Sequence, residues 1–504
     1  MQLQLARYRR LVFAGWMSNQ SSGGKITMKS NDAKKTVSSV QRIVILGASL
    51  AGLSAAEALR SEGFAGTLTV IGDEPYAPYD RPPLSKNVLT GWLPAEHTTL
   101  PQSVDLQAEW LLGVPATGLN LDNREVELAD GRRFGFDRLL IATGARARPW
   151  PDSAQAALDG VCLLRTRDDA AQLRARLAAR PKRVLVIGGG FIGSEVASVC
   201  RELGLAVTVT ERSATPLIGA LGAAAGTLAG QLQRVHGVDL RCNVTVMALE
   251  GDESGRLRRA YLSDGDILDI DVAVIALGAI RNVEWLHNSR LAFDSHGIAC
   301  DAACRAFDTD GMVTDDIFVA GDVARWPHPL YEGELLAVEH WGNAIEQART
   351  AAHNMVSAPT DLRAYKTLPA FWSRQFGVNL KTVGLLRFAD EVVLTQGSIS
   401  ERRLVAAYGY KGRIVAALTV NMARWLPAYR AMIEDRAPFP PVLHAPDGPA
   451  ELRPVPAGFP FRGQPTHSPN ATQTGPGPST PPPEESSTST KVKDPRVPPG
   501  FRPK

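Results

Sequence analysis

The 504-residue sequence has few cysteines, little net charge and no long apolar run. Its five cysteines are scattered and odd in number, which argues against a secreted disulfide framework and favours a cytoplasmic protein. No apolar run approaches the roughly 18 residues that a membrane helix requires, so no membrane partner is expected. A formal net charge of +3 gives no indication of nucleic-acid binding. The length and a hydrophobic content of 44% predict a globular chain of about three domains.

Two of the cysteines, Cys300 and Cys304, form a C-x3-C pair, but no cluster of metal-ligating residues lies near them in the sequence. We interpret them as structural thiols. The sequence therefore predicts no metal site.

Both ends of the chain differ in composition from the middle. Residues 1–40 carry seven Lys or Arg and one acid, Asp32, and their apolar stretch is too short for a secretory signal. We interpret them as a disordered extension, either an over-long start with Met17 or Met28 as the initiator or an organelle-targeting peptide. At the other end, 16 of the 35 prolines fall within residues 444–504. We expect residues 443–504 to form a disordered tail because they bury too little apolar surface.

Two glycine-rich turns are the most informative feature that is present. Residues 42–52 (RIVILGASLAG) and 183–193 (RVLVIGGGFIG) each join an apolar, strand-like run to a helix-like stretch. Glycines in such a turn let backbone N–H groups approach a pyrophosphate at the start of a helix, where the helix dipole favours negative charge. Acidic residues that suit a ribose follow a second β-rich run, Asp73 or Glu74 after the first turn and Glu211 after the second. The pair of turns predicts a protein that binds two nucleotides.

Further strand-like runs predict how the domains are connected. Apolar runs at 136–144, 271–278 and 316–322 end in Thr-Gly, Leu-Gly and Gly-Asp. We predict an α/β protein with two Rossmann-like nucleotide-binding domains, the second inserted in the first, and a small C-terminal α+β interface domain. The expected bounds are 41–150 and 280–358 for the first domain, 151–279 for the second and 361–442 for the third.

A set of short motifs follows the same order along the chain. They are the turn at 42–52, PYDRPPLSK at 78–86, ATG at 142–144, the turn at 188–193 followed by Glu195, AGD at 320–322, EHWGNA at 339–344 and FW at 371–372. Over about residues 41–435 these motifs resemble those of the FAD-dependent ferredoxin reductases, of the putidaredoxin reductase and aromatic-ring dioxygenase reductase type, in the glutathione-reductase-like superfamily. The resemblance implies FAD in the first domain, NADH in the second and an interface domain third.

The resemblance and the side-chain chemistry together predict the FAD site. Small residues of the first turn approach the pyrophosphate, although Ser49 replaces the middle glycine of the fingerprint. Lysine and arginine suit a diphosphate and a reduced flavin, and the Asp322 carboxylate suits a hydroxyl of the ribityl chain. Trp341 matches a position beside the isoalloxazine, with a core aromatic as the alternative. The predicted FAD contacts are Gly47, Ala48, Ser49, Ala51, Gly52, Asp73, Glu74, Arg81, Lys86, Ala116, Thr143, Gly144, Arg148, Asp322 and Trp341.

Glu195, two residues after the last glycine of the second turn, has two interpretations. It complements the positive end of its helix, or, as the resemblance implies, it faces the nicotinamide and pairs with Lys86 near the flavin. On the second interpretation Lys86 and Glu195 are the catalytic residues. Glu211 favours NADH because its carboxylate repels a 2′-phosphate, whereas Arg212 opposes that preference. The predicted NAD contacts are Gly188, Gly190, Phe191, Ile192, Gly193, Glu195, Glu211 and Gly278.

One more absence distinguishes this chain from disulfide reductases of the same fold. Residues 53–90 contain no cysteine, and thiol exchange requires a thiolate. We therefore predict a flavoprotein that passes hydride from NADH to FAD and then single electrons to a ferredoxin-type [2Fe–2S] protein, which serves an oxygenase or cytochrome P450. The alternatives are a rubredoxin or oxygenase-component reductase of the same fold, and a redox interaction protein similar to apoptosis-inducing factor. The oligomeric state stays open.

Overall fold

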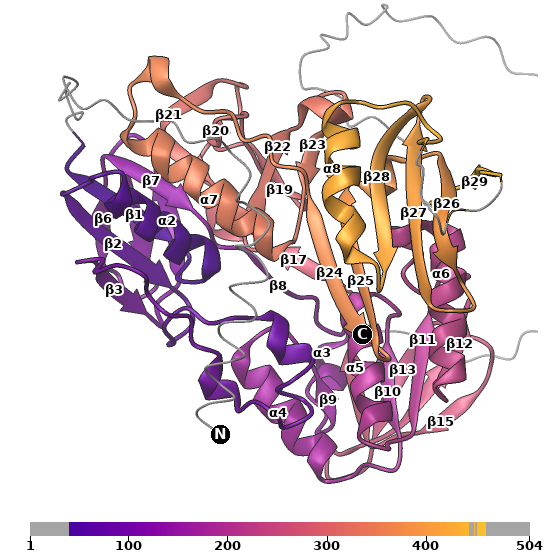
Figure 1. Ribbon diagram of the computed structural model, residues 1–504. Coiled ribbons are helices and arrows are strands. Elements are labelled where there is room, and N and C mark those ends of the chain that lie inside the picture. The colour runs from indigo at the N-terminus through magenta and orange to yellow at the C-terminus, as the bar shows by residue number, and fades with distance from the viewer. Residues whose placement is uncertain (1–39, 443–447, 449–450, 460–504) are drawn as a thin grey trace, which may run out of the picture. The chain divides into compact units, whose positions relative to one another are not determined.

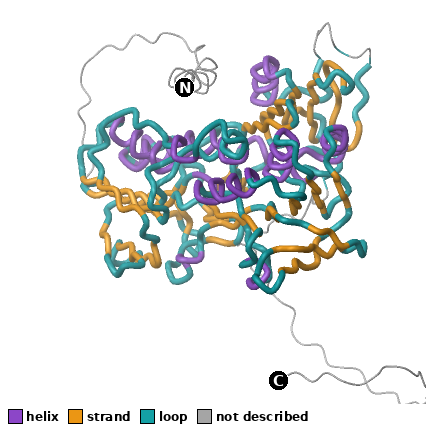
Figure 2. The backbone as a smooth tube through the Cα atoms, turned by 90° about the horizontal axis from the view of Figure 1, so that it is seen from below, coloured by secondary structure: helices purple, strands orange, loops and turns teal. Residues whose placement is uncertain are grey.

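The structure is a computed structural model that describes residues 40–442, 448 and 451–459. Nearly all of the predicted N-terminal extension and most of the predicted tail therefore lie outside the described residues. Figure 2 shows the strands in separate groups with helices between them. Within the described part of the chain, none of the helices is both long enough and apolar enough to cross a bilayer.

The first domain is built on a six-stranded sheet in which every strand except the edge strand β20 runs parallel to its neighbours. Its central strands β1, β2 and β7 are Val-, Ile- and Leu-rich and almost fully buried, as in a parallel sheet covered on both faces. Two helices, α2 and α7, pack against each other beside this sheet (Figure 1). In sheet order the strands are β20 (Arg305–Phe307), β21 (Val313–Val319), β7 (Arg138–Ile141), β1 (Arg42–Leu46), β2 (Thr67–Gly72) and β3 (Glu109–Leu112), and the helices are α2 (Leu50–Ser61) and α7 (Trp341–Val356).

The second domain has a five-stranded parallel sheet. The chain leaves the first domain through β8 (Ala145–Ala147) and returns through β17 (Ala279–Arg281), and these two strands pair antiparallel. In sheet order the strands are β12 (Asp239–Cys242), β11 (Val207–Glu211), β10 (Val184–Ile187), β16 (Val272–Ile275) and β9 (Val161–Cys162). The helices are α3 (Ser153–Ala156), α4 (Arg167–Ala178), α5 (Phe191–Glu202) and α6 (Ile218–Val235), and a separate antiparallel sheet contains β13 (Val246–Gly251), β14 (Leu257–Leu262) and β15 (Ile267–Asp269).

Smaller elements complete the first domain and the connections between domains. One small sheet contains β4 (Ala116–Asn120), β5 (Glu125–Leu128) and β6 (Arg133–Gly135). Another contains β18 (Phe293–Asp294), β19 (Gly297–Ala299), β22 (Ala324–Pro327) and β23 (Leu335–Ala337). The 3-10 helices are η1 (Pro82–Ser85), η2 (Ala95–Thr98), η3 (Glu284–Leu286), η4 (Gly321–Val323), η5 (Pro329–Tyr331), η6 (Pro359–Asp361), η7 (Leu386–Phe388) and η8 (Ala423–Trp425).

The third domain is an antiparallel sheet of six strands with helix α8 packed on it. The alternating, partly exposed pattern of its first strand is typical of a sheet with one solvated face. In sheet order the strands are β24 (Ala370–Gln375), β25 (Val378–Gly384), β28 (Arg413–Val420), β27 (Arg403–Tyr410), β26 (Glu391–Ser398) and β29 (Val455–Pro456), and the helix is α8 (Leu426–Glu434).

The last strand, β29, differs from the disordered tail that the sequence predicts for this region. It pairs antiparallel with β26. The next residue, Ala457, is buried, and its carbonyl accepts a hydrogen bond from the Ala223 N–H in α6 at 2.9 Å. Leu452 and Phe459 pack against the main core. This short stretch carries apolar side chains among the prolines, so it buries the surface that an ordered segment needs.

The two glycine turns have the same local geometry. Gly47 has a φ of +120°, and a Cβ on it would lie 2.1 Å from the carbonyl oxygen of Ala142. Gly188 has a φ of +111°, and its Cβ would lie 2.4 Å from the carbonyl oxygen of Ala276. Only glycine fits such a positive φ together with so close an approach to a neighbouring strand. The two turns therefore place α2 and α5 directly at the carboxyl ends of β1 and β10.

Candidate functional site

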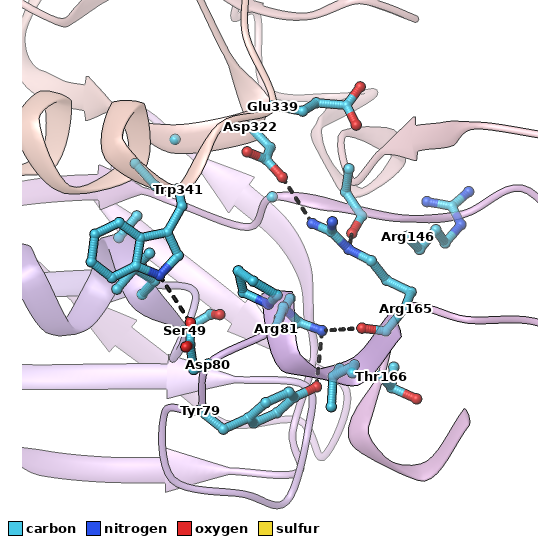
Figure 3. A pocket seen from close by; sticks show the side chains of 18 of the residues that line it. Ser49, Tyr79, Asp80, Arg81, Arg146, Arg165, Thr166, Asp322, Glu339 and Trp341 are labelled. Atoms are coloured by element: carbon cyan, nitrogen blue, oxygen red, sulfur yellow. Dashed lines mark hydrogen bonds and ion pairs between the residues drawn. The ribbon is translucent and has the colours of Figure 1, made fainter. Parts of the chain in front are cut away.

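A cavity of about 320 Å³ lies where the three domains meet. Its lining begins directly after the carboxyl ends of β1, β2, β7 and β21, the edge at which parallel sheets bind ligands. The second domain contributes the segment just before α4 and the first two turns of α5, and the third contributes the start of β24. Figure 3 shows labelled side chains of this lining, which come from both halves of the first domain and from the segment before α4.

Most of the predicted FAD contacts lie together in this lining, and three do not. Gly52, Ala116 and Arg148 lie outside it; Ala116 begins β4, and the Arg148 N–H donates to the carbonyl of Gly278. The predicted FAD contacts in the lining are Gly47, Ala48, Ser49, Ala51, Asp73, Glu74, Arg81, Lys86, Thr143, Gly144, Asp322 and Trp341.

The predicted NAD contacts divide differently. Phe191, Ile192 and Glu195, all on α5, line the cavity. The remaining predicted NAD contacts, Gly188, Gly190, Gly193, Glu211 and Gly278, lie outside its lining. The second glycine turn is therefore connected to the cavity through the first two turns of α5.

Ser49 occupies the position that is a glycine in the second turn. Ser49 precedes α2 with an extended backbone (φ −120°), and its side chain makes no capping hydrogen bond. Gly190 precedes α5 in the same way, and a Cβ there meets no atom within 4 Å. The extended backbone of Ser49 is one that any residue adopts, and the residue lies at the start of α2, where backbone N–H groups bind an anion well.

Of the two acids after β2, only Glu74 has a partner. Its carboxylate pairs with Arg81 at 2.5 Å and accepts a hydrogen bond from the Tyr79 hydroxyl at 2.5 Å. Asp73 is exposed and, among the described residues, makes neither kind of contact. The Asp73 carboxylate therefore remains available to accept hydrogen bonds from a ligand hydroxyl, and Glu74 instead holds Arg81 in place.

Arg165 lies in the cavity lining although no motif in the sequence indicates it. Its guanidinium pairs with Asp322 at 2.8 Å and donates to the Ala145 carbonyl at 2.9 Å (Figure 3). Thr166 follows it and caps α4, which fixes this part of the chain beside the first domain. Because Asp322 is 157 positions away in sequence, no local pattern identifies this pair. Arg165 thus lines the cavity as a cation, whereas Arg148, which the sequence predicts beside FAD, does not line it.

Trp341, the first residue of α7, lines the cavity and is only partly buried. Its indole N–H donates to Asp80 at 2.9 Å (Figure 3). Burial raises the pKa of the Asp80 carboxyl to about 6. Burial also lowers the pKa of the neighbouring His340 to about 4, so that imidazole is neutral at pH 7. This wall of the cavity thus has an indole and a neutral imidazole side by side.

Lys86 and Glu195 form an ion pair of 2.6 Å. The Glu195 side chain is 4% exposed, and its carboxylate also accepts hydrogen bonds from the hydroxyls of Ser85 at 2.5 Å and Ser373 at 2.6 Å. The three donors come from the first and third domains, while Glu195 comes from the second. Ser85 and Ser373 were not selected from the sequence, because the bonds span 110 and 178 positions. The carboxylate is thus engaged by specific donors and is more than a complement to the helix end.

Two phenylalanines cover this part of the cavity. The rings of Phe191, at the start of α5, and Phe371, on β24, lie with centroids 3.9 Å apart. Outside the cavity lining, Glu211 at the end of β11 accepts hydrogen bonds from the N–H groups of Gly189 at 2.9 Å and Ser213 at 2.7 Å. Glu211 therefore lies directly against the second glycine turn, as an acid that recognises a ribose requires.

The cavity lining in the described part of the chain contains no thiol. No cysteine among the described residues lines the cavity, and all five are free. Cys300 and Cys304 are fully buried, and burial raises the pKa of both thiols. The described residues contain no group of three or more His, Cys, Asp or Glu arranged to bind a metal. The chemistry of the cavity consequently depends on aromatic, hydroxyl and charged side chains.

Comparison with known proteins gives a consistent result. Residues 41–352 match the model of the pyridine nucleotide-disulphide oxidoreductase family, and residues 370–455 match the reductase C-terminal family. Rhodocoxin reductase of Rhodococcus erythropolis is 34% identical over 79% of this chain and 91% of its own length. The ferredoxin reductase component of the chlorobenzene dioxygenase of Cupriavidus sp. is 34% identical over 79% of this chain and 94% of its own length. The crystal structure of the covalent putidaredoxin reductase–putidaredoxin complex superposes with a TM-score of 0.73 and 31% identity, covering 79% of this chain and 94% of that one.

Proposed function

The chain belongs to the pyridine nucleotide-disulphide oxidoreductase family, and we propose that it is a flavoprotein that passes hydride from NADH to FAD and then single electrons to a ferredoxin-type iron–sulfur protein. The observation that carries the proposal is the buried Lys86–Glu195 pair in a cavity that all three domains line and that contains no thiol among the described residues. FAD, when bound, supplies the conversion of a two-electron donor into one-electron transfers.

The cavity lining has a group suited to each part of FAD, and most of these groups come from the first domain. Asp73 accepts hydrogen bonds from the adenosine ribose, and the start of α2 with Ser49 receives the pyrophosphate. Arg165, which precedes α4 of the second domain, places a cation near that charge and orients Asp322, whose other carboxylate oxygen has no partner among the described residues and can accept from a ribityl hydroxyl. Trp341 packs beside the flavin ring. These assignments are supported by the position of each side chain in the cavity lining.

The second domain likewise has groups suited to the ribose, the pyrophosphate and the nicotinamide of NADH. Glu211 accepts hydrogen bonds from the adenosine ribose diol, and the open turn at Gly190 receives the pyrophosphate. Phe191 covers the place where the nicotinamide meets the flavin, and Glu195 with Lys86 fixes the charge there. The family name refers to disulfide chemistry, but the cavity of this chain has no thiol among its described residues, so electrons leave the flavin directly to an external carrier.

The external carrier is a small acidic [2Fe–2S] protein serving an oxygenase or a cytochrome P450. The surface that supports this is the exposed side of β24 and β25 beside the cavity, which we call the β24 face: Trp372, Arg374 and Lys381. Trp372 is 42% exposed, Arg374 follows it on the same side of the strand, and Lys381 lies opposite Trp372 on β25. Redox partners dock briefly through modest interfaces with opposite charges. We also propose a cytoplasmic location, which the five free thiols support.

NADH-dependent reduction of cytochrome c, measured with and without a [2Fe–2S] ferredoxin, tests this function. We expect purified protein to be yellow and the rate to increase strongly when the ferredoxin is added. A gain with rubredoxin instead of ferredoxin would identify the other reductase of the same fold. Slow flavin reoxidation with no gain from any of several carriers would contradict the reductase and favour a redox-responsive interaction protein. A folded, colourless preparation that cannot be reconstituted with FAD would contradict the flavoprotein itself.

A further inference from the structure

Strand β24 of the third domain and the residue that follows it are attached to helix α5 of the second domain by two short hydrogen bonds. The Ser373 hydroxyl donates to Glu195 Oε1 at 2.6 Å, and the Phe376 N–H donates to the Ser198 hydroxyl at 2.6 Å. Glu195 and Ser198 are three positions apart and therefore lie on the same side of α5. Only the first of these two bonds reaches the carboxylate that pairs with Lys86.

The donors around Glu195 divide between its two carboxylate oxygens. Oε2 receives the Lys86 ammonium at 2.6 Å and the Ser85 hydroxyl at 2.5 Å, both from the first domain. Oε1 receives the Ser373 hydroxyl alone among these donors. A carboxylate offers about four acceptor positions, so the donors in the described part of the chain fill three and leave one on Oε1 open. With Ser373 in place, the carboxylate cannot rotate without breaking a bond to one domain or the other.

The direction of the Ser373 bond is also determined by its neighbours. The side-chain amide nitrogen of Gln375, two residues along the strand, lies 3.5 Å from the Ser373 oxygen and can only donate. The single hydroxyl proton of Ser373 is therefore directed to Glu195. Both Ser373 and Gln375 are buried, so this arrangement is shielded from solvent.

The residue before Ser373 contacts the other member of the ion pair. The Trp372 ring lies with its centroid 5.5 Å from the Lys86 ammonium. One strand of the third domain thus touches Lys86 through Trp372 and Glu195 through Ser373. The third domain, which binds neither nucleotide in the proposed function, nevertheless contacts both members of the pair.

We propose that Ser373 is a positioning residue for hydride transfer: its hydroxyl fixes the rotation of the Glu195 carboxylate and thereby keeps the Lys86 ammonium at the flavin side of the cavity. The proposal rests on the proposed function, because it assumes that FAD and NADH meet at this pair. It extends that function by making the third domain part of the hydride-transfer geometry as well as the docking surface.

Three variants of the full-length, FAD-loaded protein test the proposal: Ser373→Ala, Ser373→Thr and Ser198→Ala. Ser198→Ala is the matched control because it removes a hydroxyl from the same contact between β24 and α5 without touching Glu195. We expect Ser373→Ala to lower the limiting rate of FAD reduction by NADH roughly tenfold, the effect of about 1.4 kcal/mol on the barrier. Ser373→Thr keeps the hydroxyl and is expected to restore most of the rate.

A second readout does not depend on turnover. Spectroelectrochemistry measures the midpoint potential of the bound flavin, which a nearby cation raises because the reduced flavin is negative. We expect a more negative potential in Ser373→Ala, where Lys86 is no longer fixed, and an unchanged potential in Ser198→Ala. Equal effects of the two serine-to-alanine variants on rate and potential would show that Ser373 only joins the domains, and would overturn the proposal.

A double-mutant comparison keeps the proposal testable if Ser373→Ala is poorly folded. Ser373→Cys keeps the size of the side chain but replaces the hydroxyl with a weak donor, so it should slow FAD reduction in the wild-type background and change the rate little in a Glu195→Gln background, where the bond no longer ends on a carboxylate. Additive effects would overturn the proposal. Wild-type protein that is reduced by NADH but passes no electrons to a ferredoxin would contradict the proposed acceptor only, whereas protein that binds no FAD would contradict both.

Discussion

The indole nitrogen of Trp341 donates a 2.9 Å hydrogen bond to Asp80, and the two side chains come from the two separate segments of the first domain, 261 positions apart. Both line the cavity, and Asp80 also lies in the field of the Lys86 ammonium, which favours its charged form. Burial outweighs the hydrogen bond and the cation, so the pKa of Asp80 is raised to about 6. The Asp80 carboxyl group, which lines the cavity and accepts the Trp341 hydrogen bond, therefore binds a proton near pH 6.

Replacing Asp80 with asparagine should change how stability depends on pH. The folded protein binds the Asp80 proton more tightly than the unfolded chain, so this group makes the free energy of unfolding fall as the pH rises from about 4 to about 6. Asp80→Asn removes that dependence and keeps an oxygen acceptor for Trp341. We expect the melting temperature of the variant, relative to wild type, to rise between pH 4 and pH 7. Asp310→Asn, at an exposed turn, is the control without a trend. A constant difference across this range would contradict a raised pKa of Asp80 in the folded protein.

Alanine at the two glycines of the second turn should have unequal effects on stability. Gly188→Ala combines a φ of +111° with a contact of 2.4 Å to a strand carbonyl, so we expect a loss of stability of about 2 kcal/mol or more. Gly190→Ala places its methyl group in open space, with no atom within 4 Å, and should leave stability within about 0.5 kcal/mol. Chemical denaturation of both variants measures this difference. Equal destabilisation would contradict the geometry of the turn.

Glu211 should determine the choice between NADH and NADPH. Its carboxylate, already within 2.9 Å of the Gly189 N–H, repels a 2′-phosphate, and a penalty of about 3 kcal/mol corresponds to roughly a 10²-fold preference for NADH. We expect Glu211→Ala to reduce the ratio of kcat/KM values for the two nucleotides by about tenfold or more, mainly through KM. Arg212→Ala should instead increase the preference. Equal kcat/KM values in the wild-type protein would contradict the role given to Glu211.

Charge reversal on the β24 face should impair electron transfer without affecting hydride transfer. Lys381→Glu and Arg374→Glu remove positive charge beside the exposed Trp372, so we expect a slower ferredoxin-dependent reduction of cytochrome c and an unchanged rate of flavin reduction by NADH. The wild-type rate should fall as salt increases, because the Debye length shrinks from about 30 Å to about 8 Å. Lys182→Glu, an exposed change just before β10, is the control. A wild-type rate independent of salt would exclude an electrostatic docking face here.

The features that the sequence predicts well are local ones. A glycine turn, the apolar strand before it and the helix after it lie within about a dozen residues, so both nucleotide-binding turns can be recognised from the amino-acid sequence alone. The Lys86–Glu195 pair is implied by the family motifs around each residue. Ser85, Arg165 and Ser373 were missed because each acts on a partner more than a hundred positions away. Serine and arginine are common on surfaces, and only the packing of three domains around one cavity distinguishes these three.

The short strand β29 covers the outer edge of the third domain's sheet, which limits how far the C-terminal end can be shortened. Val455 and Pro456 pair with β26 at the outer edge of the last sheet, and proline has no N–H to offer to a further strand. The edge is therefore closed by a residue that cannot extend the ladder. A chain cut before residue 451 would uncover the backbone of β26, an eight-residue strand, and would promote pairing between molecules. We therefore expect truncation of this end to increase self-association before it changes FAD binding.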